Sequence, residues 1–405
     1  MHNKGRFPNV IFGASLRSRS AALVIILTLL FLIFITRTAP PAQAQTCGEL
    51  PAKVVIDWAQ FRFVTCHTAF NPYEFVLNPA TVLNLRLHWQ YTTGGRVLSS
   101  PTVAKGVVYV GSEDHNLYAL NARTGALLWL YTTGGSVFSS PAVANGVVYF
   151  GSDYPDNNLY ALNASTGALL WKYTMGAYLD SSPAVANGVV YVGSADDWTL
   201  YALNASTGAL LWQYRAQGPI LSSPAVANGV VYVGCRDGNL YALNARTGAR
   251  LWQSTTGPVD SSPAVANGVV YVGSWDHNLY AVNAGTGALL WKYTTGEYLD
   301  SSPAVANGVV YVGSSDDYTL YALNASTGVL LWKYKTGSGV ESSPAVANGV
   351  VYVGSYDSNL YALNASTGAL LWNYRAQDAV YSSPAVANGM VYVGSWDFNL
   401  YAFGL

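Results

Sequence analysis

The sequence contains little charge. Only 10% of its 405 residues are Asp, Glu, Lys or Arg, and the formal net charge is −1. A nucleic-acid partner needs a basic surface that neutralises phosphates, so this composition gives no support for one. Because 51% of the residues are hydrophobic, the chain also does not resemble a disordered protein. The composition therefore indicates a globular protein with a large core.

Cysteine is scarce as well: the chain has Cys47, Cys66 and Cys235. No cysteine and histidine have the spacing of a zinc site, and no phosphate loop or nucleophile elbow is present. In an oxidising compartment Cys47 and Cys66 would pair and staple the N-terminal segment. Cys235 stands where most other repeats have serine, so we expect a half-buried serine substitute instead of a reactive thiol.

The N-terminus is built like a secretory signal. Residues 1–20 contain basic residues and no acid, and the run Ala21–Ile35 is apolar except for Thr28. Ala42-Gln43-Ala44 fits a cleavage site, so we expect cleavage after Ala44 and export to the periplasm or outside the cell. The alternative is an uncleaved membrane anchor, but the apolar run is shorter than the roughly 20 residues of a spanning helix. Residues 1–44 are therefore assigned to the signal, and membrane contact is expected only if this segment stays attached.

Internal repetition dominates the chain after residue 96. The tripeptide Ser-Ser-Pro recurs eight times at intervals of about 40 residues, beginning at Ser99, Ser139, Ser181, Ser222, Ser261, Ser301, Ser342 and Ser382. Each repeat contains four short stretches rich in Val, Tyr, Leu and Trp, separated by turn residues, which is typical of strands. Four antiparallel strands in a repeat of this length predict one propeller blade. The fold class is therefore an all-β, eight-bladed propeller over residues 85–405, preceded by an N-terminal extension over 45–84.

The two ends of the repeat array indicate how the ring closes. The eighth repeat ends without its Trp-containing strand, and an orphan strand around Trp89 precedes the first repeat. We predict that this strand completes the last blade and removes the free edge that an open array would expose. A closed ring of this kind is one domain, and we expect it to be a monomer.

Each repeat carries the motif Ala-x-Asn-x-x-Thr-Gly-x-x-x-Trp, as in Ala161, Asn163, Thr166, Gly167 and Trp171. This motif closely resembles the tryptophan-docking motif of the pyrroloquinoline quinone (PQQ)-like propeller family. The chain is similar to the outer-membrane assembly propeller and to the propeller of quinoprotein alcohol dehydrogenases. That family includes dehydrogenases, envelope assembly scaffolds and sensor domains, so the resemblance is specific for fold and weak for function.

The resemblance leaves two functions open. The first is a non-catalytic exported scaffold that binds a protein or a ligand, of which a carbohydrate-binding (lectin-like) propeller is a special form. The second is a PQQ-dependent alcohol or sugar dehydrogenase with PQQ and Ca²⁺ as cofactors. The resemblance implies that such enzymes carry insertions that build a cofactor pocket and often a vicinal cysteine pair, and both are missing here. We therefore favour the scaffold and expect no cofactor, no metal and no catalytic residue.

The repeats differ from one another mainly on one face. The turn between the first two strands and the turn between the last two (A–B and C–D) are nearly constant, whereas the B–C turns and the D–A links between blades vary. We expect a protein or glycan ligand on the variable face, although loop drift would give the same pattern. The aromatic candidates for such binding are Trp198, Trp275, Tyr318, Tyr356 and Trp396.

The residue before Ser-Ser-Pro is acidic in four repeats: Asp180, Asp260, Asp300 and Glu341. We place these residues at the mouth of the channel, the last three as an arc on consecutive blades. Such carboxylates suit a hard cation such as Ca²⁺, but solvated loop acids balanced by Arg215, Lys335 and Arg375 are the simpler interpretation. A separate aspartate recurs in the B–C turns, where we expect it to cap its own turn: Asp114, Asp196, Asp237, Asp276, Asp316, Asp357 and Asp397.

Overall fold

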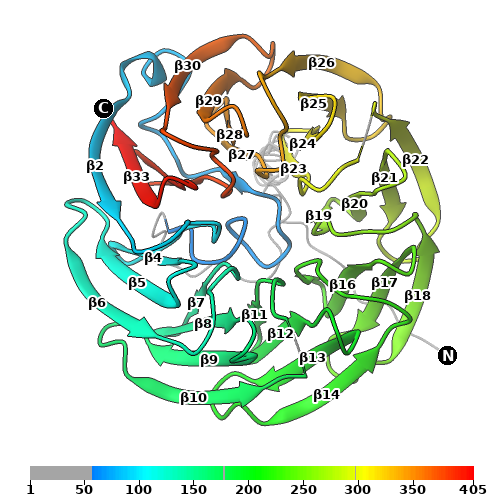
Figure 1. Cartoon of the computed structure of the whole chain (residues 1–405). Helices are drawn as coiled ribbons and strands as arrows, with labels where there is room; N and C mark the ends of the chain where they lie inside the picture. The colour runs from blue at the N-terminus through cyan, green and yellow to red at the C-terminus, as the bar shows by residue number, and fades with distance from the viewer. Residues whose placement is uncertain (1–56, 177, 297) are drawn as a thin grey trace, which may run out of the picture. The chain divides into compact units, whose positions relative to one another are not determined.

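The computed structural model describes residues 57–405 except residues 177 and 297. The predicted signal segment and Cys47 lie outside the described residues. Among the described residues, no helix has the length and hydropathy that a membrane span requires. Figure 1 shows the strands arranged as blades around a common centre.

The predicted eight-bladed propeller is confirmed: there are eight sheets, each with the four antiparallel strands of one blade, and one of them gains β1 (Phe70–Asn71) as a fifth, parallel strand. From the innermost strand outward, the blades contain β3 (Thr102–Ala104), β4 (Val107–Gly111), β5 (Asn116–Asn121) and β6 (Leu127–Thr132); β7 (Ala142–Ala144), β8 (Val147–Ser152), β9 (Asn158–Asn163) and β10 (Leu169–Thr174); β11 (Ala184–Ala186), β12 (Val189–Gly193), β13 (Thr199–Asn204) and β14 (Leu210–Arg215); β15 (Ala225–Ala227), β16 (Val230–Cys235), β17 (Asn239–Asn244) and β18 (Arg250–Thr255); β19 (Ala264–Ala266), β20 (Val269–Gly273), β21 (Asn278–Asn283) and β22 (Leu289–Thr294); β23 (Ala304–Ala306), β24 (Val309–Gly313), β25 (Thr319–Asn324) and β26 (Leu330–Lys335); β27 (Ala345–Ala347), β28 (Val350–Gly354), β29 (Asn359–Asn364) and β30 (Leu370–Arg375); and β31 (Ala385–Ala387), β32 (Met390–Gly394), β33 (Asn399–Gly404) and β2 (Arg86–Thr92).

The last blade closes the ring as predicted. Strand β2 pairs antiparallel with β33, the last strand of the chain, and Trp89 lies opposite Ala402 in the register. The first strand after the extension thus supplies the outer strand that the eighth repeat lacks. Because the two ends of the repeat array share one sheet, no blade is left with a missing strand.

Tryptophan docking joins each blade to the next. Trp129 in β6 donates a hydrogen bond from Nε1 to the carbonyl oxygen of Ala164 in the following blade, at 3.1 Å. A Cβ built on Gly167 would come within 2.8 Å of the Trp129 ring, and Gly167 has a φ of +72°. Both facts require glycine, because the ring lies directly against its backbone and the left-handed conformation disfavours other residues. Trp372 differs because the last blade has no such glycine, and it donates instead to the carbonyl oxygen of Leu85, which follows the 3₁₀ helix η1 (Val82–Asn84).

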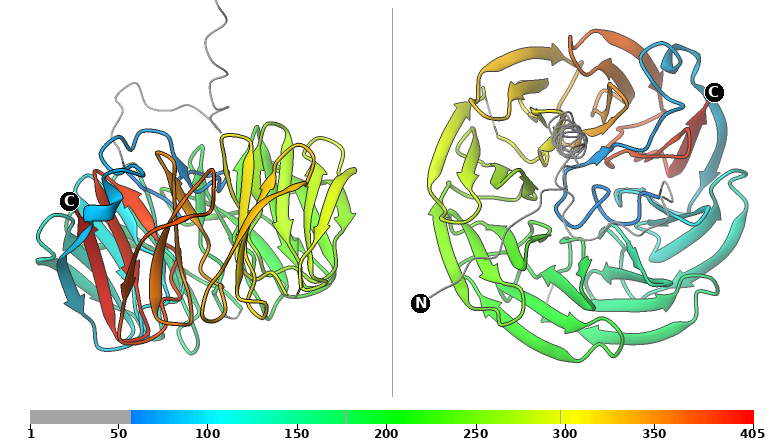
Figure 2. Two further views of the ribbon diagram at one scale, coloured as in Figure 1. Left: turned by 90° about the horizontal axis from the view of Figure 1, so that it is seen from above. Right: turned by 180° about the vertical axis from the view of Figure 1, so that it is seen from behind.

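The A–B turns are tight hairpins that explain the repeated Asn-Gly pair. Asn145 and Gly146 have φ values of +51° and +79°, as a type I′ turn requires at both central positions. In the first blade Lys105 takes the asparagine position with φ of +50°. The A–B and C–D turns form one face of the ring, which we call the constant face, and the B–C turns and D–A links form the other. The strands run between these two faces in the edge-on view of Figure 2.

The N-terminal extension fills the channel, which the sequence did not indicate. Residues 57–71, which we call the plug, follow the inside of the ring in Figure 1 and end in the short strand β1 (Phe70–Asn71), parallel to β27. The plug makes hydrogen bonds to the central valine of all eight innermost strands. Seven of these valines donate their backbone N–H to the plug, and Val386 accepts a hydrogen bond from Asn71. The plug therefore satisfies backbone groups that would otherwise line an open channel.

Candidate functional site

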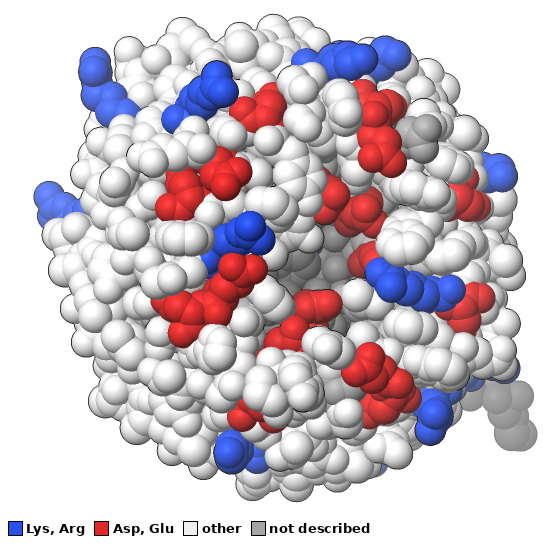
Figure 3. Space-filling model, viewed as in Figure 1, with Lys and Arg blue, Asp and Glu red and all other residues white. Residues whose placement is uncertain are grey.

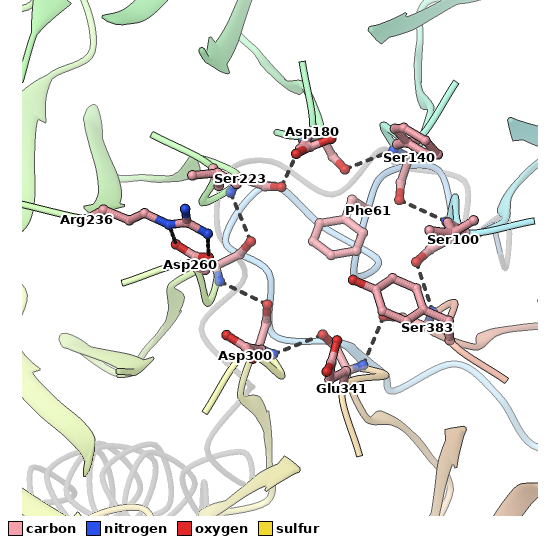
Figure 4. Close-up of a pocket in the computed structure, with 18 of the residues that line it drawn as sticks. Phe61, Ser100, Ser140, Asp180, Ser223, Arg236, Asp260, Asp300, Glu341 and Ser383 are labelled. Atoms are coloured by element: carbon pink, nitrogen blue, oxygen red, sulfur yellow. Dashed lines mark hydrogen bonds and ion pairs between the residues drawn. The ribbon is translucent and has the colours of Figure 1, made fainter. Parts of the chain in front are cut away.

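A cavity opens at the centre of the face formed by the B–C turns and D–A links. Its volume is about 460 Å³, within the usual range for small-ligand pockets. Phe61 of the plug is among the side chains that line it (Figure 4). We call this cavity the funnel. Each blade contributes its residue before Ser-Ser-Pro to the wall: Leu98, Phe138, Asp180, Leu221, Asp260, Asp300, Glu341 and Tyr381.

A ring of serines forms the lower wall of the funnel. The second serine of each Ser-Ser-Pro donates its backbone N–H to the hydroxyl oxygen of the equivalent serine in the next blade, at 2.9 to 3.0 Å, and the eighth bond returns to Ser100. The Ser-Ser-Pro repeat therefore encodes a closed ring of eight hydrogen bonds around the channel. The members of this serine ring are Ser100, Ser140, Ser182, Ser223, Ser262, Ser302, Ser343 and Ser383.

The four predicted acids lie together on the funnel wall, and each has a different environment (Figure 4). Asp260 forms a two-pronged ion pair with Arg236, with Nε to Oδ1 at 2.8 Å and Nη2 to Oδ2 at 2.5 Å. Asp300 accepts a hydrogen bond from Nε1 of Trp275. Asp180 makes no hydrogen bond with any described residue, and its side chain is exposed to the funnel.

Burial raises the pKa of several of these carboxyl groups. The pKa of Glu341 rises to about 7, first because of burial and then because of the nearby charge of Asp300. Burial raises the pKa of Asp180 to about 6, with further contributions from Asp153 and Asp260. The pKa of Asp300 is also raised, mainly by burial. These shifts favour the protonated, neutral forms of the carboxyl groups, so a cation placed among them would lower their pKa values and favour ionisation.

The acids do not converge as metal ligands do. Within residues 57–405, apart from 177 and 297, no group of three or more His, Cys, Asp or Glu side chains is arranged to hold a metal ion. The cation that balances the acids is Arg236, not the Arg215, Lys335 and Arg375 named from the sequence. The ends of β14, β26 and β30 hold those three residues on the outer strands, whereas Arg236 projects from a B–C turn toward the channel.

The five aromatic candidates divide into three groups. Trp275 lines the funnel, with the Arg236 guanidinium 4.5 Å from its ring centroid. Tyr356 and Trp396 pack beside the funnel, where both contact Tyr381. Trp198 and Tyr318 follow the turn aspartate in a left-handed conformation, with φ of +60°. These last two rings are more than one third exposed, at 38% and 40%, and do not line the funnel.

The predicted turn-capping aspartate is wrong in two blades, and in a third blade no such aspartate was predicted. In the sixth blade Asp317, not Asp316, accepts the hydroxyl hydrogen bond of Tyr321 and a backbone hydrogen bond from Thr319. Asp197 replaces Asp196 in the third blade. In the second blade, which the sequence comparison left without one, Asp156 accepts from Tyr160. The reason is that the partner tyrosine lies four residues after the aspartate in every blade, and this spacing defines the position better than distance from Ser-Ser-Pro.

This turn aspartate also bonds outside its own turn. Asp114 caps the N–H of Asn116 with one oxygen and accepts the backbone N–H of Gly94 with the other. Gly94 belongs to the preceding D–A link, so the aspartate ties one blade to the next. These aspartates are consequently structural and are unavailable to a ligand.

The cysteines agree with structural roles. Cys235 is buried and free, and its Sγ donates to the carbonyl oxygen of Gly218 at 3.2 Å, as serine hydroxyls do in other blades. Burial raises its pKa to about 12, so the thiol is protonated at neutral pH. Cys66, in the plug, is disulfide-bonded, and its predicted partner Cys47 lies outside the described residues.

The acidic residues of the blades gather on one face of the propeller, whereas Asp57 and Glu74 of the N-terminal extension accept hydrogen bonds from A–B turns of the constant face. All seventeen described acidic residues of residues 86–405 lie in B–C turns or D–A links, and none lies in an A–B or C–D turn. Figure 3 shows acidic side chains surrounding the central hollow, with most basic side chains toward the rim. We call this side the acidic face. The turns of the constant face carry only the basic residues Lys105, Arg123 and Arg246.

Comparison with known proteins supports the fold and the repeat family. The family model described as "Outer membrane protein assembly factor BamB" matches residues 84–177, 155–258, 236–342 and 335–404. No curated protein matches the sequence. Among solved structures, a europium-containing methanol dehydrogenase aligns with a TM-score of 0.74 at 16% identity, covering 86% of this chain and 98% of its own.

Two further solved structures are similar. BamB from Moraxella catarrhalis aligns with a TM-score of 0.69 at 20% identity over 79% of this chain and 100% of its own. Quinohemoprotein alcohol dehydrogenase from Comamonas testosteroni aligns with a TM-score of 0.75 at 16% identity over 86% of this chain and 80% of its own. At these identities the likeness concerns the fold alone, since one fold can carry different functions.

Proposed function

Since this chain belongs to the family of PQQ-like repeat propellers described as outer membrane protein assembly factor BamB, we propose that it is an exported, non-catalytic scaffold that binds a positively charged partner protein on its acidic face. The observation that carries the proposal is the gathering of the blades' acidic residues on one face. Complementary charge guides association and selects the partner. The secretory character of the N-terminal sequence supports a location in the cell envelope or outside the cell.

Aromatic side chains on the same face support a protein partner. Tyr356, Tyr381 and Trp396 form a cluster beside the funnel, and Arg96 lies 4.7 Å from the centroid of the Trp396 ring. Aromatic and arginine side chains are the residues most often found at the energetic centres of protein interfaces. A basic partner would contact the acidic rim while this cluster supplies apolar contact area.

The dehydrogenase alternative fits the funnel poorly. PQQ carries three carboxylates, and a site for it needs cations to neutralise them. The funnel presents four carboxyl groups and one arginine, and that arginine is already paired with Asp260. No described group of side chains is arranged to hold the Ca²⁺ that would offset this repulsion. The charge of the site therefore disfavours this cofactor, and we derive no reaction through it.

Binding of charged model peptides tests the proposal. We expect a lysine-rich peptide to bind the purified protein, a glutamate-rich peptide of equal length not to bind, and the affinity to fall with added salt. The double variant Asp300→Asn/Glu341→Gln should weaken binding, whereas the constant-face variant Arg123→Gln/Arg246→Gln should not. Equal binding of both peptides, or tight PQQ binding with Ca²⁺ and dye-linked alcohol oxidation, would contradict the proposal.

A further inference from the structure

The serine ring has unused hydrogen-bond donors. Each ring hydroxyl accepts one backbone N–H, and none donates its own proton to a described residue. Seven of the eight serines are buried, with 4 to 7% of their surface exposed, and they line the funnel. Because each ring hydroxyl uses its oxygen as an acceptor, its proton is left to donate to a ligand in the funnel that carries oxygen acceptors.

The wall above the serine ring carries hydrogen-bond acceptors instead of donors. Asp180 has a carboxylate without a hydrogen bond, and Glu341 and Asp300 lie on the same wall. An ionised carboxylate only accepts hydrogen bonds, so the Asp180 side chain can take a donor from a ligand and favours a positively charged one. On the remaining wall Leu98, Phe138 and the Tyr381 ring supply apolar surface.

We propose that the funnel binds an amino sugar, a ring that combines hydroxyl groups with a protonated amine. The amine would lie among the carboxylates, the hydroxyl oxygens would accept from the serine ring, and the apolar face of the sugar would contact the Tyr381 side. A simple alkylamine leaves the serine donors without acceptors, and a neutral sugar leaves the acidic wall without a cation. The volume of about 460 Å³ accommodates one sugar ring. This inference goes beyond the proposed scaffold function, because it requires no protein partner.

A matched set of four ligands tests each part of this chemistry. Calorimetric titration of the purified protein with D-glucosamine should show binding at least about tenfold tighter than with D-glucose, N-acetyl-D-glucosamine or cyclohexylamine, since each missing charged or polar contact costs at least that factor. Glucose and N-acetylglucosamine lack the charge, and cyclohexylamine lacks the hydroxyls. If cyclohexylamine binds as well as glucosamine, or if glucosamine shows no binding, the inference is wrong.

Variants of the funnel localise the effect. Asp180→Asn should weaken glucosamine binding about tenfold or more. Ser223→Ala should weaken the binding of glucosamine but leave the binding of cyclohexylamine unchanged. Thermal denaturation of this variant checks that the protein still folds. Asp378→Asn, an exposed acid on the same face that does not line the funnel, is the matched control and should bind glucosamine like the wild type. Loss of affinity in the control equal to that in Asp180→Asn would place the sugar elsewhere.

The two proposals fail separately. A protein that binds the lysine-rich peptide but not glucosamine retains the scaffold function and loses the sugar site. A protein that binds glucosamine but shows no preference for the lysine-rich peptide retains the sugar site and loses the scaffold function.

Discussion

Glu341 offers a quantitative test of the electrostatics of the funnel. In the folded protein burial and the neighbouring Asp300 raise its pKa from 4.5 to about 7. The folded state therefore favours the protonated carboxyl, and the stability that this gives is present below the unfolded pKa and is lost as pH rises through the folded pKa. The substitution Glu341→Gln removes the ionisation but keeps an oxygen that can accept the hydrogen bond from Tyr356.

The size of the effect follows from the pKa change. At about 1.4 kcal/mol for each pH unit, the raised pKa corresponds to an upper bound of ~3.5 kcal/mol. Glu341 is partly exposed at the funnel wall, so solvent screening reduces this to about 1 to 2 kcal/mol. With an unfolding entropy of ~2.1 cal/mol/K per residue for a propeller of this size, the variant should melt about 1 to 3 °C above the wild type at pH 8.

Thermal denaturation at a series of pH values is the assay. We expect the two melting curves to coincide at about pH 4 and to separate through the interval between pH 4.5 and 7, then to stay parallel. The control Asp378→Asn should show no such separation. A Glu341→Gln variant that melts below the wild type at pH 8 would contradict the raised pKa of Glu341. So would a difference in melting temperature that is the same at pH 4 and pH 8.

Three further predictions concern the repeat itself. Gly287→Ala should destabilise more than Gly268→Ala by about 2 kcal/mol or more in thermal or urea denaturation, because both have positive φ but only the Cβ at Gly287 would meet a docked tryptophan ring, at 2.8 Å; equal losses would show that docking contributes little. Asp317→Asn should cost about 1 to 2 kcal/mol and Asp316→Asn less than ~0.5 kcal/mol, since the first alone bonds Tyr321; the reverse order would restore the assignment made from the sequence. Lys105→Asn should raise stability by about 0.5 kcal/mol, because asparagine tolerates the left-handed turn position better, and a decrease would speak against that turn geometry.

The fold could be predicted because the signal was repeated. Eight copies of one pattern specify the blade. The eighth copy lacks its tryptophan strand and the strand around Trp89 precedes the first copy, so together they specify how the ring closes. The position of the four acids at the channel mouth also followed from the repeat, since Asp180 and its equivalents precede an innermost strand. These are local features of a regular architecture, and regular architecture converts sequence position directly into place in the ring.

The parts that escaped prediction depend on contacts between segments that are not repeats of each other. The plug has no repeat to align with, and six of its eight contacts with the valines are backbone hydrogen bonds that no side-chain pattern reveals; the Gln60 and Asn71 side chains make the other two. The serine ring was visible as a motif, but its closed geometry appears only when the eight blades meet. Arg236 is a single departure in one B–C turn, and its ion pair with Asp260 joins adjacent blades. A signal did exist for the turn aspartates, because each one precedes a tyrosine by four residues.

The direct test of the central claim, that the acidic face is the binding face, is hydrogen–deuterium exchange of the protein with and without a saturating lysine-rich peptide. The account predicts that protection falls on the D–A links and B–C turns around the funnel, including the segments that hold Asp260, Asp300 and Glu341, and spares the A–B and C–D turns. Protection confined to the constant face or to the outer strands would contradict it.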